Sequence, residues 1–251
     1  MPEKVSYGYD RILPSEKRFR VLGHFEAIAH RYDLADTLLS FGLHFFWRRR
    51  ALRRLMLRQG EGVLDLCGGT ADFALMAARS VGPSGRVVVC DLSRSMMDRG
   101  HRKAARAGLG AAIQWVQGDA ENLGFSRDSF DAVVVGYGIR NFVFLEQGLG
   151  EIWRVLKPGG RFLAMEFSIP RSVWLRKLYH HYSFRIMPWA GGLITGTAEP
   201  FRYLAESIRV FPPPARIQGL LTANGFAHAA HEFMSDGLAV LYSGQKGFNP
   251  S

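Results

Sequence analysis

Residues 63–72 read Val-Leu-Asp-Leu-Cys-Gly-Gly-Thr-Ala-Asp, and this segment is the best guide to the architecture of the chain. The apolar run over 62–67 predicts a short strand, and Gly68 and Gly69 predict a turn after it. A helix is then expected from Thr70 to about Ser80. Glycines after a strand let the backbone approach a ligand closely, and the unpaired N–H groups of the next helix face the same space.

Strands and helices alternate after this segment. Further strands are expected at 86–91, 113–117, 130–135 and 161–166, with helices over about 93–107 and 145–156 between them. Such alternation is typical of a parallel, doubly wound sheet. Two late strands, 227–233 and 238–243, are joined by the turn Ser235-Asp236-Gly237 and add an antiparallel edge. We predict an α/β, Rossmann-like fold with a seven-stranded, mostly parallel sheet.

Two helical regions lie outside this pattern. Residues 1–57 are expected to form an N-terminal helical cap, irregular up to about residue 15 and then helical over about 15–30, 32–40 and 44–57. The α/β domain covers 58–251. An aromatic, basic and helical insertion at about 171–210 is predicted to be a lid over the substrate.

Three aspartates fall at successive strand ends, where parallel sheets bind ligands. Asp65 lies at the exit of the first strand. Asp91 ends the second and suits ribose hydroxyls, and Asp119 follows the third and suits an adenine amino group. The glycine spacing is not G-x-G-x-x-G, which argues against a dinucleotide. Each acid alone also fits a helix cap or a solvated loop, but together they describe S-adenosylmethionine in a class I methyltransferase. The predicted cofactor-binding residues are Asp65, Gly68, Gly69, Thr70, Asp91, Asp119, Ala120 and Gly136.

The chain is basic, with 32 Lys and Arg against 22 Asp and Glu and a net charge of +10. The positive residues concentrate in the cap and the lid: Arg48, Arg49, Arg50, Arg53, Arg54, Arg171, Arg176, Lys177 and Arg185. They form either a solvated helix face or a patch for an anionic membrane surface. No RNA-recognition module and no Asn-Pro-Pro-Tyr-type motif is found, so no nucleic-acid partner is expected.

The two cysteines, Cys67 and Cys90, lack the spacing of a metal site, and a lone disulfide is not expected. Two cysteines that are not expected to pair indicate a protein of the reducing cytoplasm. The first twenty residues lack the apolar core of a signal peptide, and no stretch approaches the ~20 apolar residues of a membrane span. We therefore expect a cytoplasmic protein without a metal, either free or peripheral at the inner face of the membrane.

Three segments resemble one enzyme family. They are residues 32–47, which read Tyr-Asp-Leu-Ala-Asp-Thr-Leu-Leu-Ser-Phe-Gly-Leu-His-Phe-Phe-Trp, residues 154–168, which read Arg-Val-Leu-Lys-Pro-Gly-Gly-Arg-Phe-Leu-Ala-Met-Glu-Phe-Ser, and Gly138-Ile139-Arg140-Asn141. Jointly they resemble the signatures of the ubiquinone/menaquinone biosynthesis C-methyltransferase family, over roughly residues 20–246. Lys157-Pro158-Gly159-Gly160 alone is common to many methyltransferases.

The resemblance implies S-adenosylmethionine-dependent methylation of a ring carbon of a polyprenylated quinol, in the menaquinone or the ubiquinone branch. Some residues depart from the family pattern. Ala35 and Asp36 replace Met and Asn, Ala71 replaces a glycine, and 142–144 are less polar than usual. These departures leave a second reading open, a small-molecule methyltransferase of secondary metabolism. A requirement for a prenyl tail would separate the two, and the sequence leaves open whether the protein is a homodimer.

The reaction must assist loss of a hydroxyl proton and a ring proton. Arg140, with Asn141 beside it, is the first candidate: a guanidinium is a poor base but stabilises phenolate charge or orders a water. The alternative is a structural ion pair. His44 is the second candidate base, the alternative being a cap or surface residue. Tyr32 and Asp33 are expected to help close the cofactor site.

Overall fold

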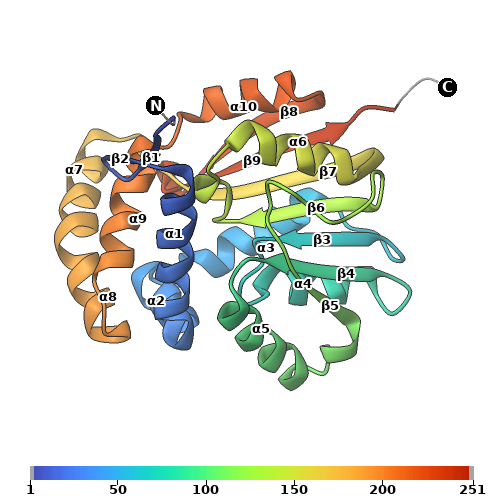
Figure 1. Cartoon of the computed structure of the whole chain (residues 1–251), viewed down its shortest axis with the longest axis horizontal. Coiled ribbons are helices and arrows are strands. Elements are labelled where there is room, and N and C mark those ends of the chain that lie inside the picture. Colours follow the sequence, from blue (N-terminus) through green and yellow to red (C-terminus); the bar gives the residue numbers. More distant parts are fainter. Residues whose placement is uncertain (1–2, 249–251) are drawn as a thin grey trace.

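The fold is built on one sheet of seven strands (Figure 1). The structure, a computed structural model, describes residues 3–248. The strand order is β5-β4-β3-β6-β7-β9-β8. The strands are β3 Gly62–Leu66, β4 Arg86–Asp91, β5 Ile113–Gln117, β6 Phe130–Gly136, β7 Leu156–Phe167, β8 Phe226–Met234 and β9 Ala239–Lys246. The first five strands in this order are parallel, and β9 runs antiparallel to both of its neighbours. The predicted fold class is confirmed.

Helices cover both faces of the sheet and bury two apolar cores. One core lies under α3 (Leu43–Leu55), α4 (Asp72–Val81) and α5 (Arg94–Arg106), and the other under α6 (Leu145–Val155) and α10 (Pro214–Ala223). Every residue of β3 is buried, because helices pack on both of its faces. The continuous apolar runs that predicted these strands reflect burial on both sides.

The order in which the chain adds strands to the sheet reverses between β3 and β6. From β3 the chain moves outward to β4 and β5, and then returns to place β6 on the other side of β3. The crevice beyond the carboxyl ends of two such strands is the usual ligand site of an open α/β sheet. Here it lies between the turn after Leu66 and the turn after Gly136.

The cap and the lid lie beside each other at this end of the sheet, as Figure 1 shows. The cap contains α1 (Pro14–Ile28), η1 (Ala29–Arg31), α2 (Tyr32–Leu39) and α3, and the lid contains α7 (Val173–His181), η4 (Tyr182–Ile186), α8 (Met187–Thr195) and α9 (Glu199–Val210). A third apolar cluster joins cap to lid through Ile28, Ala35, Met187, Phe201 and Ala205. By contrast, α3 packs into the core of the sheet. The predicted division of the chain at residue 57 stays a prediction.

The N-terminal prediction was wrong in one respect. Residues expected to be irregular form a hairpin, β1 (Val5–Tyr7) and β2 (Asp10–Ile12). Tyr7 is buried and stacks on Tyr203 of the lid, with 4.6 Å between the ring centroids. Strands of three residues are marginal alone, so this tertiary contact is what stabilises the hairpin.

The other predicted helices and strands begin and end within about three residues of the observed ones, with one exception. Strand β7 begins at Leu156 rather than at 161, and its residues 157–160 bulge out where the register against β6 shifts. A further helix, α10, occupies a stretch for which the sequence predicts no element.

Candidate active site

All eight residues predicted to bind the cofactor line one cleft beyond β3 and β6. The chain requires small residues at two of them. A Cβ on Gly68 would lie 2.9 Å from the carboxyl carbon of Asp65, and one on Gly136 would lie 2.7 Å from the ring of Phe73. The cleft therefore has backbone, rather than side chain, as part of its floor.

The turn after β3 carries backbone strain. Cys67 and Ala71 have φ values of 55° and 66°, in the left-handed region. This conformation suits glycine, and each such residue costs about 1–3 kcal/mol when it carries a side chain. Ala71, which replaces the glycine expected from the resemblance, is therefore strained, and the surrounding packing holds the turn in shape.

Two carboxylates shape this turn from opposite sides. Asp91 accepts hydrogen bonds from the backbone N–H groups of Gly69 at 2.9 Å and Ser93 at 2.8 Å. Asp65 accepts one from the N–H of Ala74 at 2.8 Å through Oδ2. Its other oxygen, Oδ1, is buried without a partner among the described residues. Burial raises the pKa of Asp65 to about 8.

These features fit S-adenosylmethionine. An unpartnered carboxylate oxygen in a buried position suits a cationic amino-acid group, whose charge would favour the ionised form. Asp91 and Asp119 both line the cleft and offer acceptors to a nucleoside. Asp119 also pairs with Arg18 of α1, at 3.0 Å, so the cap reaches this end of the cleft as well.

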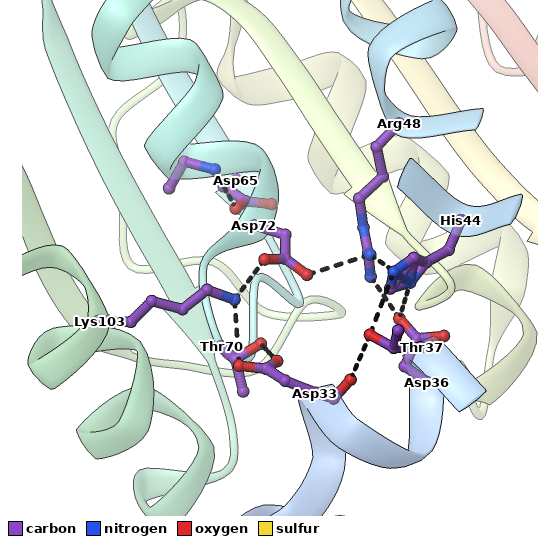
Figure 2. Close-up of polar contacts among 10 residues, drawn as sticks. Asp33, Asp36, Thr37, His44, Arg48, Asp65, Thr70, Asp72 and Lys103 are labelled. Atoms are coloured by element: carbon purple, nitrogen blue, oxygen red, sulfur yellow. Dashed lines mark hydrogen bonds and ion pairs between the residues drawn. The ribbon is translucent and has the colours of Figure 1, made fainter. Parts of the chain in front are cut away.

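Helix α2 is tied to the cleft by a set of ion pairs and hydrogen bonds, here called the cap network (Figure 2). The network consists of Asp33, Asp36, His44, Arg48, Thr70, Asp72 and Lys103. Asp33 accepts hydrogen bonds from the Thr70 hydroxyl at 2.7 Å and from Lys103 at 3.1 Å. Lys103 also pairs with Asp72 of α4. The cofactor turn, α5 and the cap are thus tied together by polar contacts, which supports the predicted closing role of Asp33.

The deeper half of the cap network is centred on Arg48 of α3. Its guanidinium contacts Asp36 at 2.8 Å and Asp72 at 3.1 Å, and its side chain is 6% exposed. His44 donates a hydrogen bond to the carboxylate of Asp36 at 2.9 Å. His44 is buried but lines neither the cofactor cleft nor the apolar cavity between cap and lid. The contact with Asp36 fits the alternative of a structural residue, and a role of His44 as a base stays a prediction.

This second cavity, of about 520 Å³, lies between cap and lid. Its walls are almost entirely apolar and aromatic, and they include Ile28, Leu39, Phe167, Leu175, Tyr179, Met187 and Phe201. Phe25, Tyr32 and Tyr137 line both this cavity and the cofactor cleft. The two spaces therefore adjoin, and these three rings form the wall between them.

Arg140 lies on η3 (Ile139–Asn141) and borders the apolar cavity. Its Nη1 donates to Glu166 at 2.6 Å, its Nε donates to Ser207 at 2.9 Å, and its backbone N–H also donates to Glu166. Burial raises the pKa of the Glu166 carboxyl, and the guanidinium opposes that rise. Asn141 lines the cofactor cleft and accepts a hydrogen bond from the Tyr203 hydroxyl at 3.1 Å. Arg140 is thus both an ion-pair partner and a cavity residue.

Comparison with known proteins agrees with this geometry. The profile of the ubiE/COQ5 methyltransferase family matches residues 14–246. The chain belongs to the ubiE/COQ5 methyltransferase family. It is 38% identical to the ubiquinone/menaquinone biosynthesis C-methyltransferase of Edwardsiella ictaluri, over 98% of both chains. It is 40% identical to the enzyme of the same name from Azotobacter vinelandii, over 96% of this chain and 95% of that one.

Solved structures give the same fold. An S-adenosylmethionine-dependent methyltransferase from Thermotoga maritima has a TM-score of 0.63 at 18% identity, covering 90% of this chain and 99% of that chain. As a ubiE/COQ5 member, the protein is an S-adenosylmethionine-dependent C-methyltransferase, and the predicted reaction in ubiquinone/menaquinone biosynthesis is confirmed at that level. The secondary-metabolism alternative is not favoured. The individual site residues stay predictions.

Sequence reasoning misses most of the cap network. In the sequence, Asp36 stands out only as a departure from a usual asparagine, and Arg48 only as part of a basic run. Arg48 pairs with both Asp36 and Asp72 and so joins three helices, which no local sequence spacing predicts. An arginine at a position of α3 that faces the core is the one signal that could have found it, because an arginine is rarely buried without a partner.

Proposed function

We propose that the acceptor is a polyprenylated quinol whose tail occupies the apolar cavity and whose ring lies at the wall of Phe25, Tyr32 and Tyr137. The observation that carries this proposal is the size and apolar lining of that cavity, directly beside the cofactor cleft. A tail-less ring would leave about 520 Å³ of apolar space unused. An isoprenoid chain gains about 25 cal/mol for each Å² of apolar surface removed from water.

The chemistry at that wall requires little of the protein beyond orientation and charge. S-adenosylmethionine supplies an electrophilic methyl group when bound. The ring carbon becomes a strong nucleophile as a ring hydroxyl loses its proton. Arg140 supplies positive charge at the edge of the apolar cavity, where it stabilises a phenolate. Glu166 and Ser207 hold the guanidinium in place.

We also propose that the mouth of the apolar cavity rests on a membrane surface. Phe41, Leu178 and Ile186 line the cavity and are also exposed. Trp174 and Trp189 of the lid are 69% and 67% exposed. Basic residues at 171, 176, 177 and 185 adjoin them in the sequence and suit anionic headgroups. Within residues 3–248, no helix has the length and hydropathy needed to cross a bilayer.

An activity assay tests the acceptor. Demethylmenaquinol and the ubiquinone-pathway benzoquinol are offered under reducing conditions, each with and without a prenyl tail. We expect transfer to at least one prenylated quinol and much weaker transfer to its tail-less form. Equal kcat/KM for the two forms would refute a role of the cavity in tail binding.

Sedimentation with anionic vesicles tests the membrane contact. Replacing Trp174 and Trp189 by Ser should reduce the bound fraction, because both side chains are exposed on the proposed face. Val116→Ser is the control, since Val116 is 36% exposed on β5, an edge strand of the sheet that contributes nothing to the lid. Equal binding of the two variants would contradict the proposed orientation.

A further inference from the structure

Tyr137 occupies an unusual position. It follows the last residue of β6, and its backbone has a φ of 60°, in the region that favours glycine. Residues held in this conformation concentrate at functional sites, because the surrounding structure must enforce it. Here the ring stacks on Phe167, with 4.1 Å between centroids and 12° between planes, and the Arg48 guanidinium lies 5.7 Å from its centroid. The ring is therefore held firmly.

The Tyr137 hydroxyl has no hydrogen-bond partner among the described residues, although the side chain is 5% exposed. A buried hydroxyl without a partner is unfavourable, and native proteins seldom retain one. Burial also raises the pKa of Tyr137 well above its ordinary value, so the hydroxyl keeps its proton and remains a donor. A held ring with a free donor is suited to a ligand that brings an acceptor.

The location of the ring indicates which ligand that is. Tyr137 lines both the cofactor cleft and the apolar cavity, and so lies where the methyl group must pass from one to the other. Of the other two rings of this wall, Phe25 has no polar atom, and the Tyr32 hydroxyl is not among the buried atoms without a partner. Arg140, the charged candidate, borders the apolar cavity but not the cofactor cleft.

We propose that the Tyr137 hydroxyl donates a hydrogen bond to a ring oxygen of the acceptor and orients the reacting carbon toward the cofactor cleft. This role rests on the proposed quinol acceptor. A quinol carries two ring oxygens, and the Tyr137 hydroxyl donates to only one of them. Because that oxygen carries negative charge once its hydroxyl has lost the proton, the hydrogen bond stabilises the phenolate from which the ring carbon attacks the methyl group.

Tyr137→Phe is the direct test, because it removes one oxygen and keeps the ring that stacks on Phe167. We expect kcat/KM for the prenylated quinol to fall about tenfold, with the affinity for S-adenosylmethionine and the melting temperature unchanged. The matched control is Tyr242→Phe, a buried tyrosine of β9 that lines none of the described cavities. Unchanged kcat/KM in Tyr137→Phe would overturn the proposal.

Binding of unreactive ring analogues separates this proposal from the proposed function. Three prenylated analogues are compared by competition: one with both ring oxygens, and two that each lack one. Tyr137→Phe should weaken the binding of the analogue with both ring oxygens and of only one of the two analogues that lack an oxygen. Equal binding of all three by both proteins would also overturn the role of the hydroxyl. If the wild-type protein methylates no quinol, the acceptor assignment fails instead, independently of the comparison between analogues.

Discussion

Glu166→Gln should destabilise the protein strongly, because it leaves Arg140 charged and without its counterion inside the protein. Glu166 is fully buried, the Arg140 side chain is 4% exposed, and their atoms lie 2.6 Å apart. Removing one partner of such a buried pair costs about 3–5 kcal/mol. For a domain of this size about 1 kcal/mol shifts the melting temperature by about 2–4 °C, so the expected decrease is about 6–20 °C.

Thermal unfolding followed by circular dichroism measures this effect, and methyl transfer measured well below the melting temperature reports on Arg140. We expect kcat to fall as well, because the guanidinium loses the group that orients it. The matched control is Glu232→Gln, whose partner Arg50 is 53% exposed. A surface pair contributes about 0–1 kcal/mol, so this variant should lose no more than about 4 °C. Similar losses in the two variants would refute the reasoning.

Three further predictions concern the cofactor cleft. The raised pKa of Asp65, about 8, means that its contribution to stability is complete below about pH 4 and is lost as the pH rises through 8. Asp65→Asn should therefore reduce the pH dependence of the melting temperature of the unliganded protein between pH 5 and 8. It should also abolish any increase in S-adenosylmethionine affinity over that range, as measured by calorimetry. Gly136→Ala should cost about 1–3 kcal/mol in urea unfolding, because its Cβ would lie 2.7 Å from Phe73. Asp33→Ala should raise the dissociation constant for S-adenosylmethionine about threefold to tenfold, through loss of the Thr70 hydrogen bond, with little change in unfolding.

The alternation of strands and helices could be predicted from the sequence because it is a local property. Buried strands such as 130–136 are continuous apolar runs, and the residues at their ends are neighbours in space by the rule of parallel sheets. For that reason the sequence alone assigns Asp65, Asp91 and Asp119 to one cleft, although they are far apart in the chain.

The features that escaped prediction depend on contacts between distant segments. The hairpin at 5–12 rests on the stacking of Tyr7 against Tyr203. Helix α10 is short, and its buried residues Ile217, Leu220 and Leu221 pack into the core beside β8 and β9. The contact of His44 with Asp36 depends on the packing of α2 against α3. The strain at Ala71 depends on its φ angle, which the sequence does not determine.

Because only three rings separate the cofactor cleft from the apolar cavity, one inhibitor could occupy both spaces. A single molecule with an adenosyl arm and an isoprenoid arm, joined where Phe25, Tyr32 and Tyr137 meet, would span both spaces. Binding of one arm raises the effective concentration of the other, so the affinities of the two arms reinforce each other. Methyltransferases that share only the cofactor cleft would accommodate half of such a compound, which makes the wall a determinant of selectivity.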